Sequence, residues 1–171
     1  WKHRRQRQMC IRDRYCSFLL HPLIGMNVDD LDELVSEFIE SHKEKLIDPM
    51  TFDLLKRHKD DFRLVASGSL DFIVKGFTNY FELDAYLGSS YEVVDNKISG
   101  KLTKAAFAQG KLEKVREWCQ KNGYIVEESF FYTDSINDLP LIKVCPRSII
   151  ISPDKKLEDY ALANNIEVLT R

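Results

Sequence analysis

Apolar residues recur at intervals of three and four from Val28 to about Lys45, which predicts an amphipathic helix with one buried stripe. The stripe consists of Leu31, Leu34, Val35, Phe38 and Ile39. Asn27 is suited to cap this helix, because its side chain can accept a hydrogen bond from a free amide of the first turn. A second helix is expected to begin at Pro49, since proline suits the first helical turn, and to run to about His58 or Lys59.

The rest of the chain alternates between short apolar runs and longer stretches with helical spacing. The apolar runs predict strands at 63–66, 130–133, 148–151 and 167–169, and a hairpin near 86–104. The helical spacing predicts helices at 70–81, 111–121 and 155–164, with a short helical stretch at 140–144. Apolar strands that alternate with helices are typical of a Rossmann-like α/β fold, a mostly parallel sheet with helices on both faces. Ligands of such sheets bind at the carboxyl ends of the strands.

The charge is unevenly distributed along the chain. The 171 residues carry a net charge of -2, yet residues 1–16 hold six basic residues and one acid. Residues 17–171 are therefore acidic overall, which argues against non-specific nucleic-acid binding, because that binding depends on neutralising phosphates. We expect no nucleic-acid partner.

Four cysteines (Cys10, Cys16, Cys119 and Cys145) form no Cys-x-x-Cys pair, and the four histidines have no spacing suited to zinc. Reduced thiols and the lack of a signal-peptide pattern favour a cytoplasmic protein. No apolar run is long enough to cross a bilayer, so we expect no membrane partner. The sequence contains no signal for the oligomeric state.

The first sixteen residues do not match the rest of the sequence. The segment WKHRRQRQMCIRDRYC has no strand or helix period, and part of it resembles translated sequencing-adapter sequence. We interpret residues 1–16 as a foreign or disordered tail that replaces the natural beginning of the protein. A basic nucleic-acid-binding arm is the alternative interpretation.

Asp134-Ser135-Ile136-Asn137-Asp138 directly follows the predicted strand at 130–133. Two carboxylates four residues apart, on a turn that enters a helix, can converge on one hard cation such as Mg²⁺. The alternative is a polar helix start, since Ser-x-x-Asp resembles a capping box. The motif alone does not decide between the two.

Two further features lie where a ligand would bind. Ser67-Gly68-Ser69 follows the strand at 63–66, and its hydroxyl and amide groups could bind a phosphate, although it could also be an ordinary turn. Lys111 stands at the start of a predicted helix, where its charge opposes the helix dipole unless an anion is bound. A solvated surface lysine is the alternative for this residue.

In this order the three features resemble motifs two to four of the haloacid dehalogenase superfamily, and more narrowly its subfamily IB, which contains phosphoserine phosphatase. The phrases LVASGSLDFIV, GKLEKVREW, FFYTDSINDLPLIK and SPDKKLEDYA are similar to that subfamily, and the resemblance covers about residues 23–171. It implies a partial helical cap at 17–60 and a core at 61–171. It also implies an Mg²⁺-dependent phosphatase of small phosphorylated metabolites.

The resemblance also implies roles for individual residues. Ser67 and the Gly68 amide would bind the transferred phosphoryl group, and Lys111 would neutralise it and hold the carboxylate of the nucleophile. Asp134 would bind Mg²⁺ directly, Asp138 would act through the waters of the metal or support it, and Asn137 would hydrogen-bond the same cluster. These roles fit phosphoryl transfer, in which positioning and charge neutralisation do most of the work.

One motif of the superfamily does not occur in this sequence. Members carry an Asp-x-Asp pair after their first strand, in which the first Asp becomes an aspartyl-phosphate and the second is the general acid and base. Before the cap this chain has only Asp13, inside the basic tail, while Asp29, Asp30 and Asp32 fall on the first predicted helix. We therefore expect the chain as given to be inactive and to lack the central strand, which leaves two unpaired sheet edges. The alternative is a natural non-catalytic relative that binds a phosphorylated ligand or partner.

Overall fold

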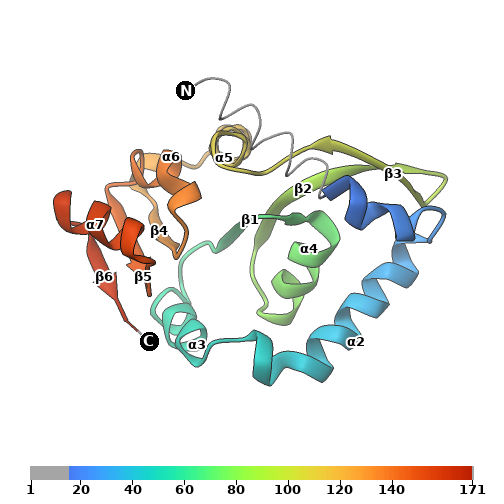
Figure 1. Cartoon of the computed structure of the whole chain (residues 1–171), viewed down its shortest axis with the longest axis horizontal. Helices are drawn as coiled ribbons and strands as arrows, with labels where there is room; N and C mark the ends of the chain where they lie inside the picture. Colours follow the sequence, from blue (N-terminus) through green and yellow to red (C-terminus); the bar gives the residue numbers. More distant parts are fainter. Residues whose placement is uncertain (1–15, 171) are drawn as a thin grey trace. The chain divides into compact units, whose positions relative to one another are not determined.

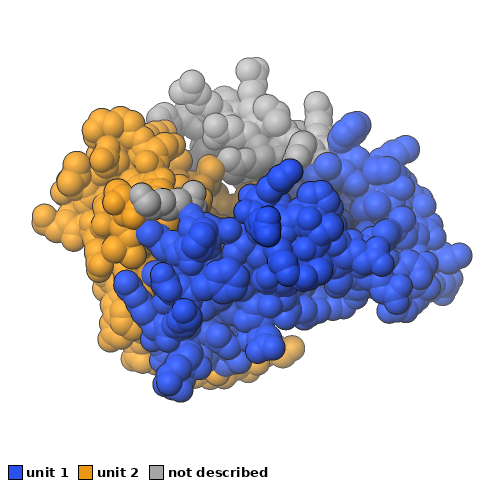
Figure 2. Space-filling view, turned by 90° about the horizontal axis from the view of Figure 1, so that it is seen from below, with its two compact units in different colours: residues 1–106 blue, residues 107–171 orange. Residues whose placement is uncertain are grey.

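A computed structural model of the chain describes residues 16–170, which form a mixed α/β structure of two compact units. One unit ends at Ala106 and the other begins at Phe107 (Figure 2). Cys10, Asp13 and the proposed foreign tail before Cys16 lie outside the described residues.

Among the described residues of the first unit, a short 3-10 helix, η1, is followed by helices α2, α3 and α4 and a three-stranded sheet (Figure 1). Its elements are η1 (His21–Leu23), α2 (Val28–Leu46), α3 (Pro49–Arg57), β1 (Leu64–Leu70), α4 (Asp71–Tyr80), β2 (Ala85–Val94) and β3 (Lys97–Lys104). The strands follow the order β1-β2-β3, with β1 parallel to β2 and β2 antiparallel to β3. Helix α4 packs against β1 and β2, and α2 packs against α4 (Figure 1).

The second unit is built on a fully parallel sheet with the strand order β4-β5-β6. Its elements are α5 (Gln109–Asn122), η2 (Val126–Glu128), β4 (Phe130–Thr133), η3 (Ile136–Asp138), α6 (Leu139–Ile142), β5 (Arg147–Ile151), α7 (Lys155–Ala163) and β6 (Glu167–Leu169). Its core joins the last strands to α6 and α7 through Ile142, Ile150, Leu157 and Ala161. The expected α/β fold with parallel strands is confirmed in this unit.

The cap predicted for the first helix and the predicted start of the second at Pro49 are confirmed. The Asn27 side chain accepts a hydrogen bond of 2.8 Å from the amide of Asp29, and Asp48 caps the helix that begins at Pro49. The predicted buried stripe of α2 is wrong at two positions, because Leu34 is 50% exposed and Phe38 is 52% exposed. Only one side of this helix meets α4, so its apolar residues extend beyond the buried face.

Strand β1 is longer than the sequence indicated. We expected Ser67-Gly68-Ser69 to be a turn, but these residues continue the strand to Leu70, and α4 begins at the next residue. The pairing with β2 shifts between Ala66 and Leu70, which marks an irregularity at the serines. The serine segment therefore lies within the carboxyl end of the strand and not after it.

The hairpin of β2 and β3 turns at Asp95 and Asn96, whose φ angles of 50° and 60° suit the tight turn predicted there. The Asn96 side-chain amide donates hydrogen bonds of 3.2 Å to Asn27 Oδ1 and 2.9 Å to Asp29 Oδ2. This turn is therefore attached to the beginning of α2, in the segment that we expected to be a cap.

Both units have edge strands without a partner on their outer side within the part of the chain that the structure describes. In the first unit such a strand is β1, whereas residues 25–28 bond to the backbone of β3 and its turn. In the second unit β4 and β6 are both open. Our predicted division into a tail, a cap at 17–60 and a core at 61–171 stays a prediction, and the two compact units divide at 106/107. Among residues 16–170, no helix has the length and apolar character needed to span a membrane.

Candidate active site

The carboxyl end of β4 leads into a buried ion pair. Lys111 Nζ lies 2.6 Å from Asp138 Oδ1, and the hydroxyl of Thr133 donates a hydrogen bond of 2.8 Å to Asp138 Oδ2. Lys111 is 9% exposed and Asp138 is 6% exposed. A buried carboxylate needs both a counter-charge and hydrogen-bond donors, and Asp138 has both. We call Lys111, Thr133 and Asp138 the acid–lysine centre.

The turn after β4 aims Asp138 inward. The amide of Ser135 donates to the Thr133 hydroxyl at 3.1 Å, and the Ser135 hydroxyl accepts from the amide of Asn137 at 3.3 Å. Ser135 therefore caps the 3-10 helix η3, as the capping interpretation expected. The other half of a capping box is absent here, because the Asp138 carboxylate is bound by Lys111 and Thr133 and the Ser135 amide is bound by Thr133.

Asp134 and Asn137 lie on the same turn as the acid–lysine centre, and both are exposed. The Asn137 side-chain amide donates 3.1 Å to the Ser135 hydroxyl, which fixes its orientation on the turn. Asp134 immediately follows the last residue of β4, which is the position from which ligands of parallel sheets are bound. The turn therefore carries one exposed carboxylate, Asp134, and one buried carboxylate, Asp138.

The surface-lysine interpretation of Lys111 is wrong, because its side chain is only 11% exposed and is paired with Asp138. The pair also offsets the unfavourable position of a cation near the beginning of α5. Ala108, the residue before this helix, has a φ of 44° and no capping side chain. A left-handed residue other than glycine is strained, and such strain often accompanies functional sites.

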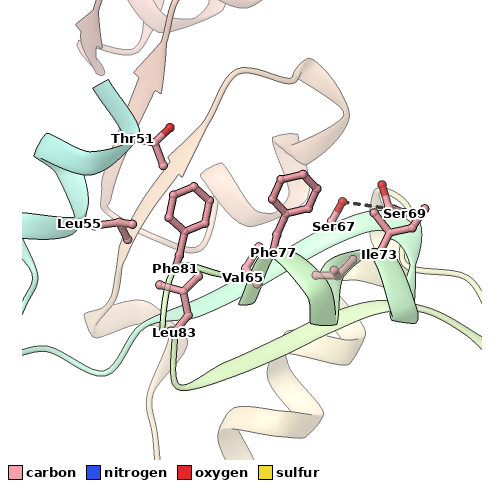
Figure 3. A pocket seen from close by; sticks show the side chains of 10 residues that line it. Thr51, Leu55, Val65, Ser67, Ser69, Ile73, Phe77, Phe81 and Leu83 are labelled. Atoms are coloured by element: carbon pink, nitrogen blue, oxygen red, sulfur yellow. Dashed lines mark hydrogen bonds between the residues drawn. The ribbon is translucent and has the colours of Figure 1, made fainter. Parts of the chain in front are cut away.

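The serine segment belongs to the first unit. The hydroxyl of Ser67 accepts a hydrogen bond of 3.2 Å from the amide of Ser69, and it lines a cavity of about 330 Å³ (Figure 3). The carbonyl of Gly68 accepts from Ser89 at 2.8 Å, and the same Ser89 hydroxyl accepts from the amide of Ala106 at 3.0 Å. Ser89 is fully buried and ties the serine segment to the chain that leaves the hairpin.

The structure brings four of the predicted site residues together and describes the other two separately. Lys111, Asp134, Asn137 and Asp138 belong to the second unit, while Ser67 and Gly68 belong to the first. Sequence reasoning missed Thr133 and Ser89. A hydroxyl residue at the last position of a predicted strand was the available signal for Thr133, and Ser89 had none, since it lies inside β2.

The donors around Asp134 fit the way in which proteins bind Mg²⁺. This ion uses one or two carboxylates and keeps waters and substrate phosphates as its remaining ligands. Asp134 offers an exposed carboxylate, and both oxygens of Asp138, four residues later, are engaged by Lys111 and Thr133. Among residues 16–170, no group of three or more acidic, histidine or cysteine side chains could hold a metal. The described residues therefore supply one exposed carboxylate of the kind that binds this ion, and no complete set of ligands.

The sequence between residues 5 and 143 matches the profile of the haloacid dehalogenase-like hydrolases. The chain belongs to this hydrolase family. The matched range includes the serine segment, Lys111 and the turn after β4, and it begins inside the basic tail.

Two curated relatives of this family member are phosphatases by name. The chain is 27% identical over 164 residues to a histidinol-phosphatase of Neisseria meningitidis serogroup C (strain 8013), with 92% of this chain and 74% of that protein covered. It is 26% identical over 160 residues to a probable phosphatase of Mycobacterium tuberculosis (strain H37Rv), of which it covers 56%. The chain thus spans little more than half of the mycobacterial relative.

Solved structures share the fold. A protein with unknown function from Bordetella pertussis Tohama I superposes with a TM-score of 0.84 at 22% identity, covering 98% of this chain and 81% of that one. A phosphoserine phosphatase in its apo form superposes with a TM-score of 0.57 at 18% identity, covering 90% of this chain and 74% of that one. The α/β architecture is therefore that of haloacid dehalogenase-like proteins.

Proposed function

We propose that this chain belongs to an Mg²⁺-dependent hydrolase of small phosphate monoesters that acts through an aspartyl-phosphate. The observation that carries the proposal is the buried Lys111–Asp138 pair on the turn that begins with the exposed Asp134. Burying a charge pair is expensive, and it is usual where a fixed positive charge must face a reacting anion. The phosphatase names of the relatives support the same chemistry.

Each residue of the acid–lysine centre has a part in this proposal. Asp138 and Thr133 hold the Lys111 ammonium in one place, so that it can neutralise a phosphoryl oxygen without reorganising. Asp134 would hold Mg²⁺, which supplies charge neutralisation for the phosphate when bound. Asn137 would hydrogen-bond the same cluster, and Ser67 with the Gly68 amide would bind the remaining phosphoryl oxygens.

The nucleophile is the part that residues 16–170 do not supply. Asp30 and Asp32 have the Asp-x-Asp spacing, but both lie on α2, and Asp32 forms an ion pair with Lys75 on α4. We therefore propose that the 171-residue chain binds phosphate without turnover. Hydrolysis would require an apolar strand that ends in Asp-x-Asp.

A comparison of two chains tests the proposal. The first is the chain as given, and the second replaces residues 1–16 with the strand and Asp-x-Asp pair encoded in the upstream reading frame. We expect the second chain to release inorganic phosphate from a monoester only when Mg²⁺ is present, and Asp134→Asn to abolish the release. Activity without Mg²⁺, or full activity of Asp134→Asn, would refute the assignment.

A second candidate is a non-catalytic relative that binds a phosphorylated ligand or partner, favoured by the helical placement of Asp30 and Asp32. A stop codon upstream together with a transcript that contains residues 1–16 would favour this candidate. Binding of inorganic phosphate to the chain as given, measured by calorimetry, is expected in both cases. Under either candidate we propose a cytoplasmic protein with a small phosphorylated ligand and no nucleic-acid partner.

A further inference from the structure

The cavity beside Ser67 is lined almost entirely by apolar side chains. Its lining residues are Thr51, Leu55, Val65, Ser67, Ser69, Ile73, Val74, Phe77, Phe81 and Leu83. Three of them carry a hydroxyl and none of these ten carries a charge. A volume of about 330 Å³ lies at the lower end of the range typical of small-molecule sites.

Three elements of the first unit build this cavity. Val65, Ser67 and Ser69 alternate along β1, and alternate residues of a strand share one face. Helix α4 contributes Phe77, and Phe81 follows directly after its end. Helix α3 adds residues from its first two turns.

Aromatic rings form the middle of the cavity. The rings of Phe77 and Phe81 are stacked, with centroids 6.5 Å apart and planes inclined by 20°. Figure 3 shows the two rings side by side and turned to the same side, with the Ser67 hydroxyl toward one end and Thr51 toward the other. Flat aromatic groups bind well against such rings, because offset and edge contacts add to the burial of apolar area.

We propose that this cavity binds the uncharged aromatic group of a phosphate monoester whose phosphate contacts Ser67. The inference rests on the proposed function for the role of Ser67, and on the lining of the cavity for the nature of the attached group. The ammonium and carboxylate of phosphoserine find no counter-charge among these lining residues. Burying them there is unfavourable, whereas an aromatic ring is buried favourably. The phosphoserine kinship of the subfamily therefore does not fix the substrate of this chain.

The test uses the full chain and fluorescence or calorimetric titration with 1-naphthol, 1-naphthyl phosphate, O-phospho-L-serine and inorganic phosphate. Thr51→Glu places a carboxylate in the cavity wall, and Met50→Glu places one at the neighbouring position of α3, which does not line the cavity. Both changes add an acid to the first turn of a helix, where an acid is tolerated well, so both variants are expected to fold.

We expect 1-naphthyl phosphate to bind at least about ten-fold more tightly than O-phospho-L-serine. We expect Thr51→Glu to weaken 1-naphthol binding at least about five-fold and Met50→Glu to leave it unchanged. Equal effects of the two variants, or tighter binding of O-phospho-L-serine, would overturn the proposal. Binding of 1-naphthyl phosphate no tighter than that of 1-naphthol would also overturn it, since the phosphate would then make no contact.

The probes separate this proposal from the proposed function. 1-Naphthol carries no phosphate, so its binding reports on the cavity alone. Inorganic phosphate carries no aromatic group, so a failure to bind it counts against the phosphate-binding role and leaves the 1-naphthol result intact.

Discussion

Lys111 and Asp138 lose their hydrating water when the chain folds. In its place they gain one contact of 2.6 Å with each other and a hydrogen bond from Thr133 to Asp138. Transfer of two charges out of water costs free energy that their attraction only partly returns. Apolar residues of similar volume at these positions would hold the fold as well or better. The pair is therefore better explained by the placement of the Lys111 ammonium than by stability.

A double-mutant cycle tests this explanation. Lys111→Met leaves the buried Asp138 carboxylate without a counter-charge, and we expect it to lower the free energy of unfolding by about 3–5 kcal/mol. The double variant Lys111→Met/Asp138→Leu removes both charges and should lose much less than the two single variants together. Urea denaturation of the unmodified chain, Lys111→Met, Asp138→Leu and the double variant measures the four free energies of unfolding.

The matched control for this cycle is Lys101→Met, which breaks the exposed pair of Lys101 and Glu92. Exposed pairs contribute little, so this variant should unfold close to the unmodified chain. If the losses in free energy of unfolding at Lys111 and Asp138 were additive, the two side chains would act independently. That outcome would contradict the ion pair in the structure.

Cys145 gives the chain a defined sensitivity to alkali. Burial raises the pKa of this thiol from 9.0 to about 11, so the folded chain keeps the proton after the unfolded chain has lost it. The folded state then binds more protons between about pH 9 and 11, and the free energy of unfolding falls as the pH rises through that window. Below pH 9 the contribution is complete and constant.

Urea denaturation at intervals from pH 8 to pH 10 measures this slope. Cys145→Ala removes the titrating group, so its stability should decline less steeply above pH 9 than that of the unmodified chain. Parallel slopes would mean that the thiol titrates alike in both states. The exposed cation Lys156 offers a control, since Lys156→Met should leave the slope unchanged.

Residue-scale prediction from the sequence succeeded where residue type and position both carry information. The acids after β4 were found from their spacing and their place at the end of a strand, and the lysine at the start of α5 from its position against the helix dipole. The partners were not found. Whether Asp138 points to a metal or to Lys111 depends on how the turn closes, and that closure is set by hydrogen bonds from Thr133 and Ser135.

At the scale of elements, α2 and α4 approach closely at one glycine. A Cβ atom at Gly76 would overlap Val35 Cγ1 and would lie 3.1 Å from Ile39 Cδ1. The ion pair of Asp32 and Lys75 joins the same two helices. The first helix of the proposed cap is thus held against α4 by both packing and charge.

Gly76→Ala tests the close approach. Alanine favours helix over glycine, so an open site would gain stability. At this site we expect a loss of about 1–3 kcal/mol, because the added methyl group displaces Val35. Val35→Ala supplies the missing space, so Gly76→Ala should cost much less in that background. Thermal unfolding of the unmodified chain, the two single variants and the double variant measures these effects. A stabilising effect of Gly76→Ala alone would contradict the close packing of α2 and α4.

The types of the elements followed from the sequence, and their ends and faces followed less well. Strand β4 was predicted at its observed bounds, since an apolar run between polar turns allows little else. Strand β1 was predicted to stop before Ser67, because serine and glycine usually mark turns. The exposed Leu34 and Phe38 show the same limit. The apolar pattern of one helix does not indicate how much of its surface a neighbouring helix will cover.

At the scale of the whole molecule, each unit has a sheet with an open edge strand within the described residues. Open edges present unpaired amides and carbonyls that can pair with a further strand or with another chain. Both edges, β1 and β4, belong to strands whose carboxyl ends carry predicted site residues. Unpaired backbone groups at β1 and β4 therefore lie on the strands that lead into the proposed chemistry.

Hydrogen exchange of the full chain tests these edges directly. The amides of β2 and β5 lie on strands with partners on both sides, while those of β1 and β4 that face outward have none among the described strands. We expect the outward amides of β1 and β4 to exchange at least about ten-fold faster than the amides of β2 and β5 at low protein concentration. Helix amides of α5 and α7 supply internal references in the second unit.

The dependence of amide exchange on protein concentration distinguishes an open edge from one that a second copy of the chain covers. If copies of the chain pair through these edges, exchange in β1 and β4 slows as the concentration rises, while exchange in β2 and β5 stays constant. Protection of β4 equal to that of β5 at the lowest concentration would contradict an open edge. A chain that begins with an apolar strand ending in Asp-x-Asp should protect an edge at every concentration, because the pairing is then within one molecule and needs no second copy.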